Sequence, residues 1–243
     1  MKRMNNNISR VSLISGAVQT GRADYVAALV AQALEAGVPA EQILYDGLLE
    51  GMRRLGIKFR KNEVYVPEVL VAARALNRGM SLLRPKLISE GVRPIGKVVL
   101  ATVKGDMHDV GKNMVRMMME GSGLQVVDLG VDKTAADIVE AVRTHRPQIV
   151  ALSALLTATM DEQRVVIEAL IDAGLRDSVK VLVGGAPVTQ AFCDLIGADG
   201  YAPDAASAAE LAKVLLGAGS SVPVSVTQPK KCDILLENAR GMT

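Results

Sequence analysis

The chain has 243 residues, with 28 lysines and arginines against 26 aspartates and glutamates, so its formal net charge is only +2. No long basic run suggests a nucleic-acid-binding face, and no apolar stretch of about 18 residues suggests a membrane span. The first residues lack the apolar core of a signal peptide, so we expect a cytoplasmic protein with an aliphatic core.

The first part of the chain, to about residue 91, shows only helical periodicity. Apolar residues recur every three or four positions in segments at about 8–20 and 26–34, from about residue 40, and from Pro67. Gly37 followed by Pro39 is a helix stop signal, and Pro67 suits the first turn of a helix. Short connections between four helices predict a small helical bundle over residues 1–91.

The period changes after residues 91–96, where two glycines and a proline interrupt the pattern. Strand-like segments are expected at 97–102, 125–128, 148–153, 179–183 and about 200–201, and helices at about 110–122, 134–144, 159–173, 188–196 and 205–216. This alternation predicts an α/β domain over residues 92–217, with a doubly wound, five-stranded parallel sheet of the flavodoxin-like or Rossmann-like class. Residues 218–243 are expected to form a linker and a tail.

Unusual residues follow three of the predicted strands. They are Gly105-Asp106-Met107-His108 after the first strand, Ser153-Ala154-Leu155 at the end of the third, and Gly184-Gly185 after the fourth. Because open α/β sheets bind ligands at the carboxyl ends of their strands, we expect these residues to form one binding site.

His108, one of only two histidines, follows Asp106 by two residues, a spacing that suits a metal ligand whose imidazole is held by a carboxylate. A single histidine cannot build a zinc site, so a metal bound here should bring its own equatorial ligands. The plain alternative is a hydrogen-bonded surface or core histidine, with Asp106 as a turn or capping residue, Ser153 as a packed hydroxyl and Gly184-Gly185 as a simple turn.

The segments 105–111, Ser153-Ala154-Leu155 and Gly184-Gly185 together resemble the D-x-H-x-x-G…S-x-L…G-G signature of cobalamin-binding domains. The segment from Tyr65 to Leu76 resembles part of the helical cap beside that domain in cobalamin-dependent methionine synthase. A cap followed by such a domain, over about residues 8–216, is similar to the corrinoid proteins of methyltransferase systems acting on methylamines, methanol, betaines or methoxylated aromatics.

This resemblance implies that His108 is the lower axial ligand of cobalt in cobalamin, in place of the cofactor's own dimethylbenzimidazole. It implies that Asp106 hydrogen-bonds the far nitrogen of the imidazole, and that Thr159, where methionine synthase has a serine, extends this relay. Ser153 and Thr157 would contact the displaced nucleotide tail.

The resemblance also implies that Gly184, Gly185 and Gly111 leave room for this tail. The other cofactor-binding positions that it implies are Gly105, Met107, Asp109, Val110, Leu155, Tyr201 and Ala202. Tyr65 and Val66 of the cap would face the upper side of the corrin ring and move aside for transfer, although Tyr65 and Leu70 could equally belong to the core of the bundle.

The implied function is that of a methyl carrier, which is not an enzyme on its own but a component of a methyltransferase system. Cobalt as Co(I) would take a methyl group from a substrate on one methyltransferase, and methylcobalamin would pass it to a second, with tetrahydrofolate or a thiol such as coenzyme M as acceptor. Oxidation to Co(II) implies a reductive activase as a further partner.

Three alternatives remain open. One is a subunit of an adenosylcobalamin mutase, and another is a cobalamin-based sensor or regulator, although the chain lacks the tryptophan typical of sensor caps. The third is a flavodoxin-like domain for another nucleotide.

Overall fold

A computed structural model of the protein describes residues 2–218, and for residues 2–9 only the backbone. The helical bundle consists of α1 (Lys2–Gln19), α2 (Ala23–Glu35), α3 (Ala40–Gln42), the π-helical stretch η1 (Ile43–Leu49), α4 (Glu50–Arg60) and α5 (Val66–Ser89). The α/β part consists of β1 (Lys97–Thr102), α6 (Val110–Glu120), β2 (Gln125–Asp128), α7 (Ala135–His145), β3 (Ile149–Ser153), α8 (Thr157–Met160), α9 (Glu162–Asp172), η2 (Arg176–Ser178), β4 (Lys180–Gly184), α10 (Gln190–Leu195), β5 (Gly200–Ala202) and α11 (Ala205–Leu215). The tail expected at residues 218–243 lies, apart from its first residue, outside the described residues.

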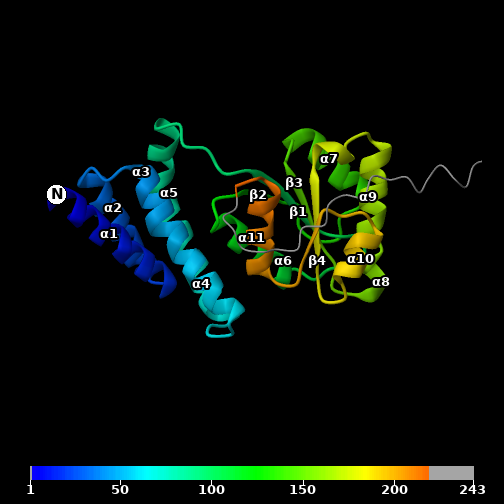
Figure 1. Cartoon of the computed structure of the whole chain (residues 1–243), viewed down its shortest axis with the longest axis horizontal. Helices are drawn as coiled ribbons and strands as arrows, with labels where there is room; N and C mark the ends of the chain where they lie inside the picture. Colours follow the sequence, from blue (N-terminus) through cyan, green and yellow to red (C-terminus); the bar gives the residue numbers. More distant parts are fainter. Residues whose placement is uncertain (1, 219–243) are drawn as a thin grey trace, which may run out of the picture.

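The five strands form one parallel sheet in the order β2-β1-β3-β4-β5, which confirms the predicted fold class. Val99 of β1 pairs with Val127 of β2 on one side and with Val150 of β3 on the other. Helices α6 and α11 cover one face of the sheet, and α7, α9 and α10 cover the other (Figure 1). Because the strand order reverses between β1 and β3, the connections after these strands leave in opposite directions and open a crevice at the carboxyl edge.

The sheet separates two hydrophobic cores. One core packs Val150 and Val181 against α7 and α9. The other packs Leu100 and Ala151 against α6 and α11, and continues without interruption into the bundle. The bundle and the sheet are therefore joined by apolar packing as well as by the chain.

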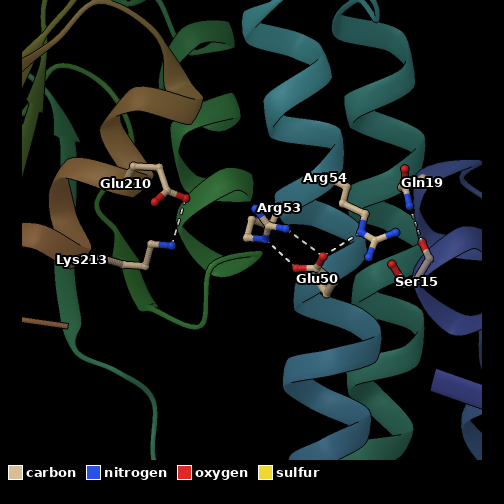
Figure 2. A network of polar contacts seen from close by, with 7 residues as sticks. All are labelled: Ser15, Gln19, Glu50, Arg53, Arg54, Glu210 and Lys213. Carbon is tan, nitrogen blue, oxygen red and sulfur yellow. Dashed lines mark hydrogen bonds and ion pairs between the residues drawn. The ribbon is translucent and has the colours of Figure 1, made fainter. Parts of the chain in front are cut away.

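The bundle contacts the α/β part through α4 and α5, which pack against α11 and α6 (Figure 1). Figure 2 shows a polar network at this contact, in which Glu50 accepts hydrogen bonds from Arg53 at 2.5 Å and from Arg54 at 2.7 Å. Arg53 lies between Glu50 and the ion pair of Glu210 with Lys213 on α11. The hydrogen bond from Arg53 outweighs the effect of burial and, with help from Arg54, lowers the pKa of Glu50 to about 2.

Two helices differ from their predicted form. The helix expected from residue 40 contains the π-helical stretch η1, where Gly47 packs so closely on α1 that a Cβ would lie 3.2 Å from Ile14. The helix expected at 159–173 starts at Thr157 and is divided at Asp161 into α8 and α9. A close approach of α1 accompanies the first departure, and near the second the Thr159 hydroxyl on α8 donates a hydrogen bond to Asp106. None of the helices in residues 2–218 has the length and apolarity to cross a lipid bilayer.

Candidate functional site

A cavity of about 530 Å³ opens at the carboxyl edge of the sheet, between the loops that follow β1, β3 and β4. Its inner part is apolar, with Leu100, Ala151 and Leu182 from the strands and Val115 and Ala208 from α6 and α11. Ten of the residues predicted from the sequence line it: Met107, His108, Asp109, Val110, Gly111, Ser153, Leu155, Gly184, Gly185 and Ala202. The cavity thus combines a polar rim with a deep aliphatic channel, as ligand sites commonly do.

The turn after β1 places Asp106 beneath the cavity and His108 at its rim. Gly105 adopts a φ of +76°, which turns the chain so that the side chain of Asp106 is fully buried. Oδ1 of Asp106 accepts hydrogen bonds from the backbone N–H of His108 at 3.0 Å and from its Nδ1 at 2.7 Å. Oδ2 accepts from the N–H of Leu155 at 2.7 Å and from Oγ1 of Thr159 at 2.8 Å. Both oxygens are therefore paired, and the imidazole is held in one orientation.

These contacts also set the charge of the site. Burial by itself would raise the pKa of Asp106, but the N–H groups of His108 and Leu155, the imidazole and the Thr159 hydroxyl together hold that pKa well below its usual range. An ionised carboxylate favours the proton on Nδ1 of His108 and leaves the lone pair on Nε2. The His108 side chain is 50% exposed, and within residues 2–218 its Nε2 has no hydrogen-bond partner. Nε2 is the atom available to a ligand in the cavity.

The donor set is too small for a metal ion bound by protein alone. Within residues 2–218, no three side chains of histidine, cysteine, aspartate or glutamate gather into a metal site. A single imidazole beside an apolar channel fits a metal whose other ligands belong to a large organic ring.

The paired glycines line the cavity and are also required by packing within the protein. Gly185 has a φ of +125°, and a Cβ there would lie 1.8 Å from the carbonyl oxygen of Ala154. At Gly184 a Cβ would lie 3.0 Å from the carbonyl oxygen of Ala202. These glycines first allow the loops after β3, β4 and β5 to pack backbone against backbone. Gly111 has open space around its Cβ position and lines the cavity, so no packing within the protein requires a glycine there.

Seven predicted residues do not line the cavity: Gly105, Asp106 and Thr159, which form the hydrogen-bonded turn and its support, and Thr157, Tyr201, Tyr65 and Val66. Thr157 is exposed at the start of α8, and Tyr201 packs against the core on the far face of the sheet. Val66 packs on the bundle core, whereas Tyr65 is 66% exposed and Leu70 42% exposed, so the alternative that Tyr65 and Leu70 form bundle core is wrong. The expected cover over the upper side is absent from this arrangement, because the bundle packs on α6 and α11.

Three contributors to the site were not predicted. The N–H of Leu155 donates to Asp106, but a backbone group carries no signal in the sequence. Gln163 is fully buried, and its Nε2 donates at 3.1 Å to the carbonyl oxygens of Leu152 and Gly184, which joins β3 to β4. Lys112, 2% exposed, pairs with Asp128 at 2.6 Å and anchors α6 to the end of β2. A charged residue, Asp128, at the end of the predicted strand 125–128 was the only hint of this pair.

Comparison with known proteins gives consistent matches. The model of a family described as a B12 binding domain matches residues 96–210, and a second model with that description matches residues 13–84. Dimethylamine corrinoid protein 3 of Methanosarcina acetivorans is 42% identical over 181 residues, which are 74% of this chain and 85% of that protein. A corrinoid protein of Desulfitobacterium hafniense is 38% identical over 213 residues, which are 86% of this chain and 99% of that protein.

Solved structures agree in fold. A cobalamin-binding protein from Desulfitobacterium hafniense superposes with a TM-score of 0.72 and 32% identity, over 84% of this chain and 98% of that chain. A chain of the methanol:cobalamin methyltransferase complex from Methanosarcina barkeri superposes with a TM-score of 0.77 and 28% identity, over 88% of this chain and 82% of that chain. The likeness therefore extends over both the bundle and the sheet.

Proposed function

Because this chain belongs to the corrinoid proteins, which carry a methyl group on a cobalamin-type cofactor, we propose that it serves a methyltransferase for methylated amines or methanol. The group would pass to a second methyltransferase, with tetrahydrofolate or a thiol as acceptor. A reductive activase would complete the system, since loss of one electron from the cofactor would stop the cycle. The names of the similar proteins, which include dimethylamine and trimethylamine corrinoid proteins, support this substrate class.

The observation that carries the proposal is the imidazole of His108, held from below by a buried carboxylate at the rim of a large cavity. When bound, the corrinoid supplies a cobalt centre that accepts and releases a methyl group. We propose that Nε2 of His108 would bind the cobalt and that Asp106 would keep the proton on Nδ1. Thr159, 2.8 Å from Asp106, would complete the relay.

The channel below the rim would take the nucleotide tail of the cofactor. Its walls between α6 and α11 are aliphatic, with Val115 and Ala208 facing Leu100 and Ala151, and they suit an aromatic base. Gly111 and Ser153 lie at its entrance, where we propose that the missing side chain and the hydroxyl accommodate the linker of the tail.

We also propose that the bundle moves during the reaction. Tyr65 and Leu70 expose apolar surface, and the bundle lines no part of the cavity in the described arrangement. A shift of α4 and α5 toward the rim would exclude water from the reactive side of the corrin, and the return would admit a partner enzyme.

Reconstitution with cobalamin tests the proposal, with His108→Ala as the variant and His145→Ala as the matched control. His145 ends α7 and lines no part of the cavity. We expect the absorption spectrum of the bound cofactor to change in His108→Ala and to match the wild type in His145→Ala. Identical spectra for all three proteins would refute histidine ligation. Transfer of a labelled methyl group from dimethylamine or methanol, in the presence of the corresponding methyltransferase, tests the substrate class.

A further inference from the structure

The loop after β2 contacts the turn that carries Asp106. The N–H of Gly105 donates to Oδ1 of Asp132 at 2.7 Å, and the N–H of Asp132 donates to the carbonyl oxygen of Asp106 at 3.0 Å. One residue thus makes two reciprocal hydrogen bonds to the turn, one through its side chain and one through its backbone. The first joins an N–H to a carboxylate, which makes it stronger than a bond between neutral groups.

Asp132 adopts an unusual backbone conformation to make these bonds. Its φ is +53°, and among the described residues only two other non-glycine residues, Asn62 and Arg146, have a positive φ. Backbone hydrogen bonds on either side of Asp132 hold this conformation. The N–H of Thr102 donates to the carbonyl oxygen of Gly130, and the N–H of Lys133 donates to the carbonyl oxygen of Thr102, each at 3.0 Å. Aspartate tolerates the left-handed region better than most residues, and such strain persists where the surroundings enforce it.

The turn at Gly105 and Asp106 is held by hydrogen bonds from two different segments of the protein. Oδ2 of Asp106 is held by two groups that follow β3, the N–H of Leu155 and the hydroxyl of Thr159, while Oδ1 is held by His108. The backbone of the same turn is held by Asp132, which accepts a hydrogen bond from the N–H of Gly105 and donates one to the carbonyl oxygen of Asp106. Asp106 therefore makes hydrogen bonds to the segments that follow β2 and β3, and its orientation depends on both.

We propose that Asp132 is a positioning residue for the site: its two hydrogen bonds fix the turn at Gly105 and Asp106, and through it the direction of the His108 imidazole. Asp132 lines no part of the cavity, so it acts only through the turn. The effect of Asp132 on the turn at Gly105 and Asp106 can be measured in the cofactor-free protein. Its effect on cobalamin binding rests on the proposed role of His108.

Two variants separate the carboxylate from the backbone conformation. Asp132→Gly keeps the left-handed conformation and removes the acceptor, whereas Asp132→Asn keeps both an acceptor oxygen and tolerance of positive φ. Arg146→Gly is the matched control, because it relieves a φ of +46° at the end of α7.

The first measurements use the cofactor-free protein. We expect hydrogen exchange of the Gly105 amide to become roughly tenfold faster in Asp132→Gly, with changed ring nitrogen signals of His108, and to stay within about threefold of the wild type in Asp132→Asn. Arg146→Gly should leave both signals unchanged. In a second measurement, absorbance titration with cobalamin should show roughly tenfold weaker binding for Asp132→Gly alone.

Wild-type exchange and ring signals in Asp132→Gly would overturn the proposal, as would equal effects of the glycine and asparagine variants. If the wild-type Gly105 amide itself shows no protection, the proposal fails without any variant. Altered apoprotein signals with unchanged cobalamin affinity would overturn the link between the turn and cofactor binding. Failure of histidine ligation would appear separately, in the spectrum of His108→Ala.

Discussion

Replacement of Gly185 by alanine should destabilise the protein more than any other single methyl group added at the site. A Cβ at this position would lie 1.8 Å from the carbonyl oxygen of Ala154, where non-bonded atoms need more than 3 Å. The loop after β4 must therefore move by more than 1 Å. That movement disturbs the hydrogen bonds from Ala154 to Gly184, at 3.1 Å, and from Val188 to Gly185, at 3.0 Å.

The expected cost has two parts. Alanine at a φ of +125° costs about 1–3 kcal/mol in backbone strain. The overlap with Ala154 adds about 1–3 kcal/mol, the usual cost of overpacking. The sum of about 2–6 kcal/mol is a large fraction of the stability of a typical domain.

Urea unfolding of the cofactor-free protein, followed by circular dichroism, measures this loss. Gly174→Ala is the control, because Gly174 has a φ of +68° but no atom within 4 Å of its Cβ position. The control should lose only the strain part, about 1 kcal/mol. Equal losses in the two variants would show that the contact with Ala154 relaxes without cost, which would refute the argument from overlap.

Three further predictions follow from the same site. Gly111→Ala adds a methyl group in open space within α6, so we expect the free energy of unfolding in urea to rise by about 0.5 kcal/mol. We also expect cobalamin titration to show weaker binding, and unchanged binding would contradict the proposed role of Gly111. Hydrogen bonds hold the pKa of Asp106 below the value that this carboxyl has in the unfolded chain. The stabilisation that ionised Asp106 gives the folded protein is therefore complete at neutral pH and declines as pH falls below about 4. The difference in unfolding free energy between the wild type and Asp106→Asn should therefore shrink with acidification, and a difference independent of pH would contradict this. Lys112→Met leaves Asp128 without its buried partner and should cost about 3 kcal/mol in thermal or urea unfolding, whereas the additional change Asp128→Leu should recover most of this loss.

Much of the fold could be predicted because it depends on local patterns. The strands β1 and β2 begin and end at the predicted residues, since β-branched runs between turn signals are read from a few neighbouring positions. The helical bundle was equally visible from its apolar periodicity. The strand order and the π-helical stretch η1 were not, because they depend on which surfaces meet after the chain has folded.

The site divides in the same way. Asp106 and His108 stand two residues apart, so their contact at 2.7 Å is a property of one short loop, and the sequence alone suggested it. The other partners of this loop come from distant segments: the N–H of Leu155, the hydroxyl of Thr159 and the carboxylate of Asp132.

Among these, Thr159 was expected only through a family resemblance, and nothing in the sequence indicated Asp132. The sequence by itself therefore indicated the pair of Asp106 and His108 and the edge of the sheet on which it stands. The tertiary structure decided how they are held, and where the bundle rests. The physical reason is that a hydrogen bond across loops, or a helix packed on a helix, is set by the spatial arrangement of segments that the sequence separates by tens of residues.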